Sequence, residues 1–266
     1  MTDCIVNDAV FDGLAGHIDT EGLLLEWVEA PWDTAVFGYP VLQINHVEIR
    51  GPSAGTDFAG FEKIRAKLGV KIISCRLPHG YLRESMFLED HGFRFIEMIY
   101  GPEYKQLQEF TVEQGEELAV MLADSNDLPE ILAITESAFH NERFHVDPRL
   151  DHSLGSRRYC NWVRSSLEHD SQKLYVLRDK EIAIAFFVTE RLDDGTCYWH
   201  LNAVAPDVQG HGYGRRAWLT MMNLARKEGA RQVKTSIVAR NHKVLNLYSS
   251  LGFRFPPPMM TFHWVR

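Results

Sequence analysis

Three glycines at alternate positions, Gly210, Gly212 and Gly214, lie between an apolar segment and a segment with helical spacing. A strand that passes through such a loop into a helix leaves backbone N–H groups unpaired at the helix N-terminus, where they attract an anion. Glycine lets the backbone approach that anion closely and adopt positive φ. Arg215 and Arg216 follow inside the helix and add positive charge. This stretch therefore predicts a phosphate-binding loop.

Two familiar nucleotide loops fit the spacing less well. A dinucleotide-binding fold has Gly-x-Gly-x-x-Gly after the first strand of a βαβ unit, whereas this loop reads Gly-x-Gly-x-Gly and comes late in the chain. A P-loop ends in Gly-Lys-Ser or Gly-Lys-Thr, which is absent from this segment. A glycine-rich turn without a ligand is the remaining alternative, and the unclaimed amides between strand and helix disfavour it.

Two segments resemble the GNAT N-acyltransferase superfamily. VAPDVQGHGYGRRAW resembles its acyl-CoA loop, Gln/Arg-x-x-Gly-x-Gly/Ala, and ARNHKVLNLYSSLGFRF resembles its later asparagine, tyrosine and Gly-Phe segment. They occur in the order typical of that superfamily, separated by one helix and one strand, and the resemblance covers roughly residues 119–266. The loop departs from the pattern in reading QGHGYG at residues 209–214, which leaves its register on the phosphates open.

The resemblance implies acetyl-CoA (coenzyme A) as the cofactor and no metal. The amides of residues 209–214 would hold the pyrophosphate, the strand at residues 202–204 would pair with the pantetheine arm, and Tyr248 would lie near the sulfur. The residues implied in cofactor binding are Asn202, Ala203, Val204, Gln209, Gly210, His211, Gly212, Tyr213, Gly214, Arg215, Asn241 and Tyr248.

The implied reaction is direct attack of a primary amine on the thioester, because no Cys/His pair or serine elbow indicates a covalent enzyme intermediate. Tyr248 suits the role of acid, since a phenol with an ordinary pKa of about 10 can protonate a leaving thiolate. For the base, two-residue alternation places Tyr198, His200 and Asn202 on one face of a strand, and His200 has a suitable ordinary pKa. Glu190 on the preceding strand and ordered water are the other options.

A finer resemblance concerns the acceptor. PWDTAVFGYPV, SAFHNERFHVDPRLD, YCNWVRSSL and MMTFHWVR are similar to dTDP-fucosamine acetyltransferases, in which a degenerate GNAT-like first half precedes a working second half. An amino sugar nucleotide is then the expected acceptor, and arginines such as Arg157 and Arg158 suit its pyrophosphate. A solvated surface loop is the alternative for this segment. The residues expected to bind the acceptor are Phe139, Arg143, His145, Asp147 and Glu190.

Alternating strand and helix patterns indicate an α/β or α+β fold, and the resemblance implies the GNAT fold, a mixed, mostly antiparallel sheet flanked by helices. The polar stretch TVEQGEE separates an expected degenerate GNAT-like domain, residues 1–110, from a catalytic domain, residues 111–266. We expect strands at residues 23–30, 36–50, 71–77, 94–101, 173–179, 181–192, 197–205, 232–239 and 259–266, and helices at 57–68, 81–93, 127–141, 156–169, 213–227 and 242–252.

Residues 69–95 align without a gap with residues 229–255, and both segments end in GFRF, which indicates an internal repeat. A strand-helix-strand arrangement common to both segments, without a repeat, is the alternative explanation, as is chance. In the first copy, Tyr81 and Leu88 take the positions of Asn241 and Tyr248, so the chemistry is expected in the second copy alone.

The composition limits the partners. A formal charge of −8 and a pI near 5.8 argue against a broad nucleic-acid surface. The four cysteines contain no CxxC pair, which indicates reduced thiols. The sequence shows neither a secretory leader nor an apolar run of about 20 residues that would span a membrane. We expect a soluble cytoplasmic protein that acts on a small-molecule amine, without nucleic acid or membrane partners, and a homodimer stays open.

Two other functions stay open from the sequence. One is a non-catalytic acyl-CoA-binding module, and the other is an N-acetyltransferase that acts on a peptide or protein amine. The joint presence of the glycine loop and Tyr248 favours an enzyme, and the crowded region before the catalytic strands disfavours a peptide acceptor.

Overall fold

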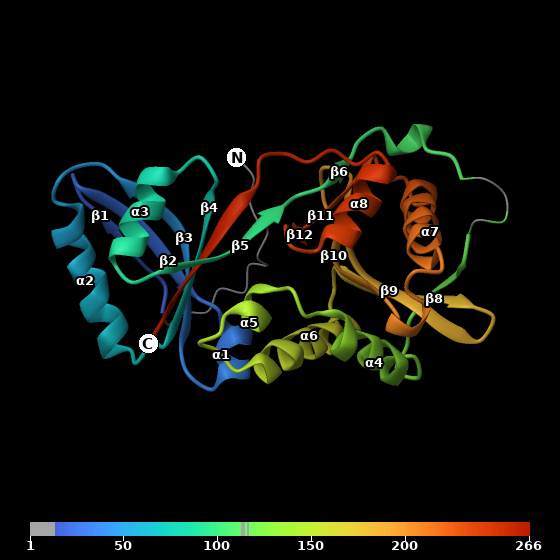
Figure 1. The fold of residues 1–266 in the computed structure, drawn as a ribbon, viewed down its shortest axis with the longest axis horizontal. Helices are drawn as coiled ribbons and strands as arrows, with labels where there is room; N and C mark the ends of the chain where they lie inside the picture. Colours follow the sequence, from blue (N-terminus) through green and yellow to red (C-terminus); the bar gives the residue numbers. More distant parts are fainter. Residues whose placement is uncertain (1–13, 113–114, 116) are drawn as a thin grey trace. The chain divides into compact units, whose positions relative to one another are not determined.

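The structure, a computed structural model, describes residues 14–112, 115 and 117–266 (Figure 1). The described chain forms two compact units, one from residues 14–95 with 261–266 and the other from the described residues of 96–260. The domain boundary expected after residue 110 stays a prediction, and residues 113, 114 and 116 of the polar stretch lie outside the described residues. No helix of the described chain is long and apolar enough to cross a membrane.

The first unit is a sheet with helices packed on it. Its strands run in the order β1-β2-β3-β4-β13, so that a strand from the end of the chain lies beside β4. Phe58 of α2 and Phe87 of α3 are in contact, with ring centroids 5.3 Å apart, so these two helices pack against each other. The elements are β1 (Gly16–Asp19), β2 (Leu23–Glu29), α1 (Pro31–Phe37), β3 (Val41–Ile49), α2 (Ala54–Lys67), β4 (Ile72–Pro78), α3 (Leu82–Asp90) and β13 (Met259–Val265), and most of β5 (Arg94–Tyr100) belongs to the second unit.

Two boundaries in this unit differ from the sequence prediction. PWDTA was expected to be a turn with a strand from residue 36, but residues 31–37 form α1. Pro31 fits the first helical turn, where no N–H bond is lost, and Gly38 at φ 76° ends the helix in the left-handed conformation. Helix α2 begins at Ala54 with Ser53 as the N-cap residue, rather than at Asp57, which lies in the first turn.

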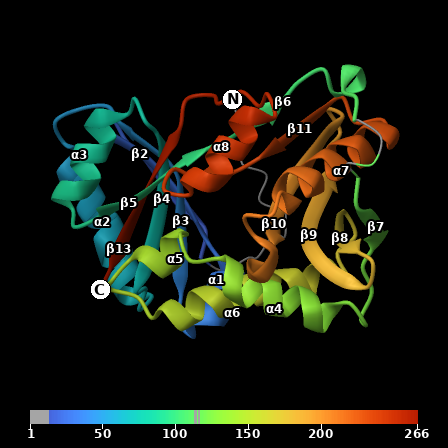
Figure 2. The same cartoon turned by 45° about the vertical axis from the view of Figure 1, so that its right-hand side comes forward.

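The second unit is a mixed, mostly antiparallel sheet with helices on both faces (Figure 2). Its strand order is β6-β11-β10-β9-β8-β7. Strands β10 and β11 pair in parallel, while the other neighbouring pairs of this order are antiparallel. Helices α7 and α8 share one core with the sheet, and α4 and α6 share another on the opposite face. The elements are β6 (Glu103–Tyr104), β7 (Ala119–Leu122), α4 (Leu128–Ala138), α5 (Arg143–Val146), α6 (His152–Ser166), β8 (Gln172–Asp179), β9 (Ile182–Arg191), β10 (Thr196–Val204), α7 (Tyr213–Lys227), β11 (Gln232–Thr235), β12 (Ile237–Val238) and α8 (His242–Ser250).

The two copies of the predicted repeat form the same elements at aligned positions. Strand β4 aligns with β11 and β12, and α3 aligns with α8 from first residue to last. The strands that precede the two copies also pair in the same way. Strand β3 pairs in parallel with β4 over Val41–Ile44, and β10 pairs in parallel with β11 over Thr196–Trp199. Both strands then lose their parallel partner in mid-strand.

Candidate active site

Strands β10 and β11 part in the middle of the second unit's sheet. Their pairing ends at Trp199 and Thr235, while β10 continues to Val204. The N–H of Ala205 donates to the Ile184 carbonyl of β9 at 2.8 Å. Because backbone groups alternate between the two edges of an antiparallel strand, those of Ala203 point to β9 and those of Asn202 and Val204 point to the open edge. Two residues of β10 therefore present backbone donors and acceptors where β11 has left.

A bulge in β10 changes which side chains share a face. The pairing with β9 shifts register between Trp199 and Leu201, so His200 is an extra residue in the strand. Trp199 lies in the core under α7, whereas Leu201 lies in the core under α4 and α6. The expectation that Tyr198, His200 and Asn202 share one face is therefore wrong, because the bulge resets the two-residue alternation.

The consequence is that the acid and base candidates lie on opposite faces of β10. Val204 packs in the core under α7 and α8, and Asn202 faces the same way, toward Tyr248. The His200 ring faces α6 instead, with its centroid 5.8 Å from the Trp162 ring and 4.9 Å from the Tyr198 ring.

The glycine loop lies directly before α7. Gly210 and Gly212 have φ of 82° and 83°, and a Cβ at either position would meet nothing within 4 Å. Within the described chain, the backbone N–H groups of residues 210–215 make no hydrogen bond, and the first bonded amide is that of Arg216, which donates to the Gly212 carbonyl at 3.3 Å. The side chain of Gln209 donates to the Val204 carbonyl at 3.1 Å and ties the loop to the open end of β10. Unpaired amides at the N-terminus of a helix are suited to bind an anion, and the anion site at this loop stays a prediction.

The other residues expected around the loop have defined places. The Tyr213 hydroxyl donates to Asp179 at 2.6 Å, while His211 and Arg215 are exposed. Asn241 is the N-cap residue of α8, and its side chain accepts from the Val244 N–H at 3.4 Å. Asn241 therefore fixes the start of the helix that carries Tyr248.

Tyr248 is buried in the core between α7, α8 and the sheet. Its side chain is 1% exposed, and its ring meets Trp218 and Phe253 edge-on. Burial raises the pKa of Tyr248 to about 12, and donors on the side chains of Trp218, Thr235 and Asn202 oppose that rise. The phenol therefore keeps its proton at neutral pH, and the surrounding donors favour the phenolate that remains once the proton has left.

His200 is held by Glu190 on the neighbouring strand. Its Nε2 lies 2.7 Å from Glu190 Oε2, and Glu190 Oε1 accepts from the Ser171 hydroxyl at 2.6 Å. Burial lowers the pKa of His200, and Glu190 offsets only part of that effect. Burial raises the pKa of Glu190, but the bonds from Ser171 and His200 outweigh it and bring the pKa below the ordinary value. Glu190, which is also expected to bind the acceptor, contacts the candidate base.

Four of the residues expected to bind the acceptor, Phe139, Arg143, His145 and Asp147, are buried, so the alternative of a solvated surface loop is wrong for them. Phe139 and His145 both stack on Tyr159, with interplanar angles of 9° and 16°, and Arg143 is 8% exposed. Asp147 is fully buried and accepts from the Arg149 side chain at 2.8 and 2.7 Å. The segment is part of the core against α6 because its aromatic and charged side chains find partners there.

Two titratable groups in this segment, His145 and Glu142, meet within the protein. His145 Nδ1 lies 3.6 Å from Glu142 Oε2, and its Nε2 lies 3.2 Å from the Ser156 hydroxyl. Burial lowers the pKa of His145 to about 4 and raises that of Glu142 to about 7. The contact is therefore not an ion pair at neutral pH, since burial disfavours the charged form of each group.

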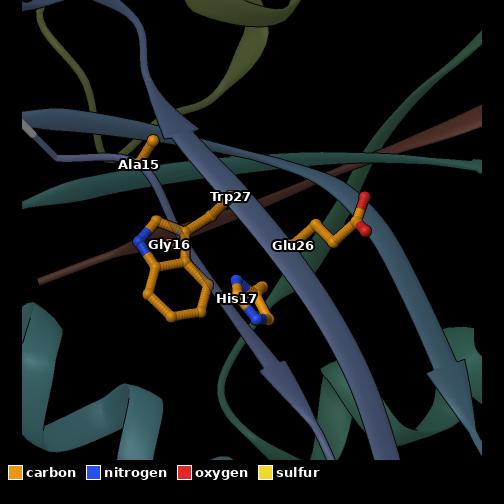
Figure 3. A pocket seen from close by; sticks show the side chains of 5 residues that line it. All are labelled: Ala15, Gly16, His17, Glu26 and Trp27. Atoms are coloured by element: carbon orange, nitrogen blue, oxygen red, sulfur yellow. The ribbon is translucent and has the colours of Figure 1, made fainter. Parts of the chain in front are cut away.

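A hollow of about 340 Å³ lies on the first unit, beside β1 and β2 (Figure 3). Trp27 contributes an indole ring, and His17 and Glu26 face each other across the strand pair. Ala15 and Gly16 complete its lining. None of the site residues predicted from the sequence lines this hollow.

Comparison with known proteins agrees with the site. The model of the acetyltransferase (GNAT) family matches residues 129–253, which include β10, the glycine loop and Tyr248. A search of curated proteins gives no match. A GCN5-related N-acetyltransferase from Sphaerobacter thermophilus is 12% identical with a TM-score of 0.61, over 91% of this chain and 76% of that chain.

Two further structures extend the likeness of fold. A GCN5-related N-acetyltransferase from Kribbella flavida is 12% identical with a TM-score of 0.59, over 94% of this chain and 89% of that chain. A tandem GNAT protein from the clavulanic acid biosynthesis pathway is 12% identical with a TM-score of 0.55, over 91% of this chain and 78% of that chain. Residues 129–253 therefore match the acetyltransferase (GNAT) family, which supports a transferase, and the likeness of fold to these structures extends over most of the chain.

Proposed function

We propose that the second unit transfers an acetyl group from acetyl-CoA to the primary amine of a small molecule. The observation that carries the proposal is the placement of unpaired backbone groups in two adjoining places. Residues 210–215 offer N–H groups at the start of α7. At the open edge of β10, the backbone groups of Asn202 and the N–H of Val204 are available, while the Val204 carbonyl accepts from the Gln209 side chain.

These groups fit the two polar parts of coenzyme A. The diphosphate suits the loop, because Gly210 and Gly212 leave open space beside amides at a helix N-terminus. The amide-rich pantetheine arm suits the open edge of β10, where it can complete the ladder that β11 leaves. When bound there, acetyl-CoA supplies a thioester as the acyl donor.

The protein then has to move two protons. His200 accepts one proton from the acceptor ammonium, and the neutral amine nitrogen forms a bond to the acyl carbon while the carbon–sulfur bond breaks. Tyr248 donates its hydroxyl proton to the sulfur, and the phenolate recovers a proton from the acetylated nitrogen. A backbone N–H of β10 at the open edge polarises the acyl carbonyl.

For the acceptor, we propose an anionic amine, with a 4-amino-4,6-dideoxy sugar nucleotide as the first candidate. The support is the resemblance of SAFHNERFHVDPRLD and YCNWVRSSL, together with a cation near the base. The Arg158 guanidinium lies 5.5 Å from the Trp162 ring centroid, and Trp162 contacts His200. An acceptor that reaches His200 along α6 would pass this cation.

We also propose that the first unit is a degenerate copy without acyl-CoA chemistry. At the start of α2, the Asp57 carboxylate accepts from Thr20 and Ser53 at 2.8 and 3.0 Å, and so places negative charge where the second unit has its glycine loop. Leu88, fully buried, takes the position of Tyr248. A carboxylate at that helix start repels a diphosphate, and leucine has no proton to donate.

The test is release of thiol from acetyl-CoA in the presence of a panel of amines. The panel contains amino sugar nucleotides, free amino sugars, polyamines and peptide N-termini, and coenzyme A binding is measured separately by calorimetry. We expect turnover with a small anionic amine. Binding without stimulation by any amine would indicate a non-catalytic module, turnover with peptides alone would overturn the acceptor class, and lack of binding would overturn the site.

A further inference from the structure

A chain of hydrogen bonds extends from His200 away from the reacting groups. His200 Nε2 contacts Glu190 Oε2 at 2.7 Å, Glu190 Oε1 accepts from the Ser171 hydroxyl at 2.6 Å, and Ser171 contacts His169 Nδ1 through its backbone N–H at 3.2 Å. The side chains of His200 and Glu190 are 12% and 9% exposed. Two strands and the turn after α6 therefore combine to hold one imidazole.

The direction of the bond at Nε2 follows from chemistry. Ser171 and His200 keep Glu190 ionised, and a carboxylate is an acceptor alone, so Nε2 must carry the proton that it donates. In the neutral ring, Nδ1 is then the acceptor. Nδ1 makes no hydrogen bond within the described residues, and it is not among their buried unpaired atoms, so solvent reaches it.

The bulge places His200 beside the site proposed for the acyl donor. His200 is the extra residue of β10 at the point where β11 leaves, next to the open edge proposed for the acyl donor. The Trp162 ring on α6 and the Tyr198 ring flank it, so packing as well as Glu190 restricts its rotation. The ring is thus fixed at the site with its basic nitrogen uncovered.

We propose that Glu190, anchored by Ser171, is a positioning residue that holds His200 in the Nε2-protonated tautomer, so that Nδ1 accepts the proton of the acceptor amine. This inference rests on the proposed function. In the step, an ammonium N–H bond breaks, its electron pair stays on nitrogen, and the proton forms a bond to Nδ1. The imidazolium that results is stabilised by Glu190 and later returns the Nδ1 proton to water.

The charged and titratable groups around His200 come from four segments. Glu190 lies on β9, Tyr198 lies on β10 beside the ring, and His169 lies in the turn after α6 and lowers the pKa of His200 by its charge. Arg158 on α6 is separated from the ring by Trp162. Glu190 is the nearest of these groups, so a change of its charge has the largest effect on His200.

The experiment compares wild type with Glu190→Gln, which preserves size and hydrogen bonding but removes the charge. With the best amine of the panel, we expect the acid limb of the kcat/KM profile to move to lower pH by about one unit. We also expect the plateau to fall by at least about tenfold. Glu228→Gln is the matched control, because Glu228 also accepts from an aromatic side chain, Tyr175, at 3.0 Å, on the other face of the sheet. The control should keep the wild-type profile.

A second measurement needs neither acyl donor nor acceptor. Nitrogen-15 shifts of the imidazoles in the full-length protein, with His200→Gln to assign the signal, report the tautomer and the pKa of His200. We expect the Nε2-protonated form in wild type and a lower pKa in Glu190→Gln. An Nδ1-protonated ring, or an unchanged profile in Glu190→Gln with an active wild type, would overturn the positioning role and leave the proposed function standing. Failure of the wild type to acetylate any amine would overturn the proposed function instead.

Discussion

The substitution Gly212→Ala tests the phosphate loop against a control in the other unit. Gly212 and Gly38 both lie at a helix end, with φ of 83° and 76°, and a Cβ would meet nothing within 4 Å at either position. Alanine in the left-handed region costs about 1 kcal/mol of unfolding free energy at each position. The two variants should therefore lose similar stability in urea unfolding.

Coenzyme A binding should separate the two variants. At residue 212 the methyl group enters the open space beside the unpaired amides, whereas residue 38 lies in the unit without such a loop. A hydrogen bond to a charged group contributes about 1.5–3 kcal/mol, so loss of one amide-phosphate bond weakens binding by about 10- to 100-fold. Calorimetry should show this loss for Gly212→Ala and the wild-type Kd for Gly38→Ala. Equal Kd values in all three proteins would refute the assignment of the diphosphate to this loop.

Three further perturbations have defined outcomes. Tyr248→Phe should lower kcat by about 100-fold or more while the calorimetric Kd of coenzyme A stays unchanged, because the proton donor is lost but the ring is kept. The pKa of Glu142 rises from 4.5 to about 7 by burial, so stability falls as pH increases across this range; Glu142→Gln should be stabilised relative to wild type more at pH 8 than at pH 5 in urea titrations. Gly155→Ala places a Cβ 2.8 Å from His145 Nε2 and should lower the free energy of unfolding by about 1–3 kcal/mol. Gly55→Ala lies in open space on α2 and should raise the free energy of unfolding by about 0.5–1 kcal/mol. Chemical unfolding measures both changes.

The sequence predicts helix bounds well where glycine positions and apolar periodicity indicate the same helix. Residues 213–227 form α7 as expected, because an apolar stripe begins directly after Gly212, and Gly229 follows its end with φ 83°. Residues 31–37 were predicted as a turn and the start of a strand, although Pro31 and Gly38 are start and stop signals that could have identified α1. The short edge strands β6 and β7 carry no strong pattern of their own and depend on their neighbours.

The sequence identifies the residue types of the candidate site, but it predicts only part of their arrangement. Glycines, an asparagine, a tyrosine and a histidine can be recognised by type and spacing, but no residue pattern marks the bulge at His200. That bulge decides that Asn202 faces Tyr248 while His200 faces Glu190. For the charged segment at residues 142–147, the sequence left an acceptor-binding region and a solvated surface loop open, and the structure buries it. Its burial depends on Gly155, which leaves room for the His145 ring against α6, and this is a tertiary effect.

A comparison of the two units distinguishes the backbone features that they share from the side chains in which they differ. Strand β3 also loses its parallel partner in mid-strand, after Ile44, and its pairing with β2 shifts register there, so Asn45 is the extra residue where the second unit has His200. The parted strands and the bulge are thus present in both units. On the proposal that the first unit is a degenerate copy, these backbone features do not suffice for acyl transfer, and Leu88→Tyr would supply one of the proposed chemical groups, the acid. Because Asp57 still opposes a diphosphate at the start of α2, we expect that variant to bind coenzyme A with wild-type stoichiometry.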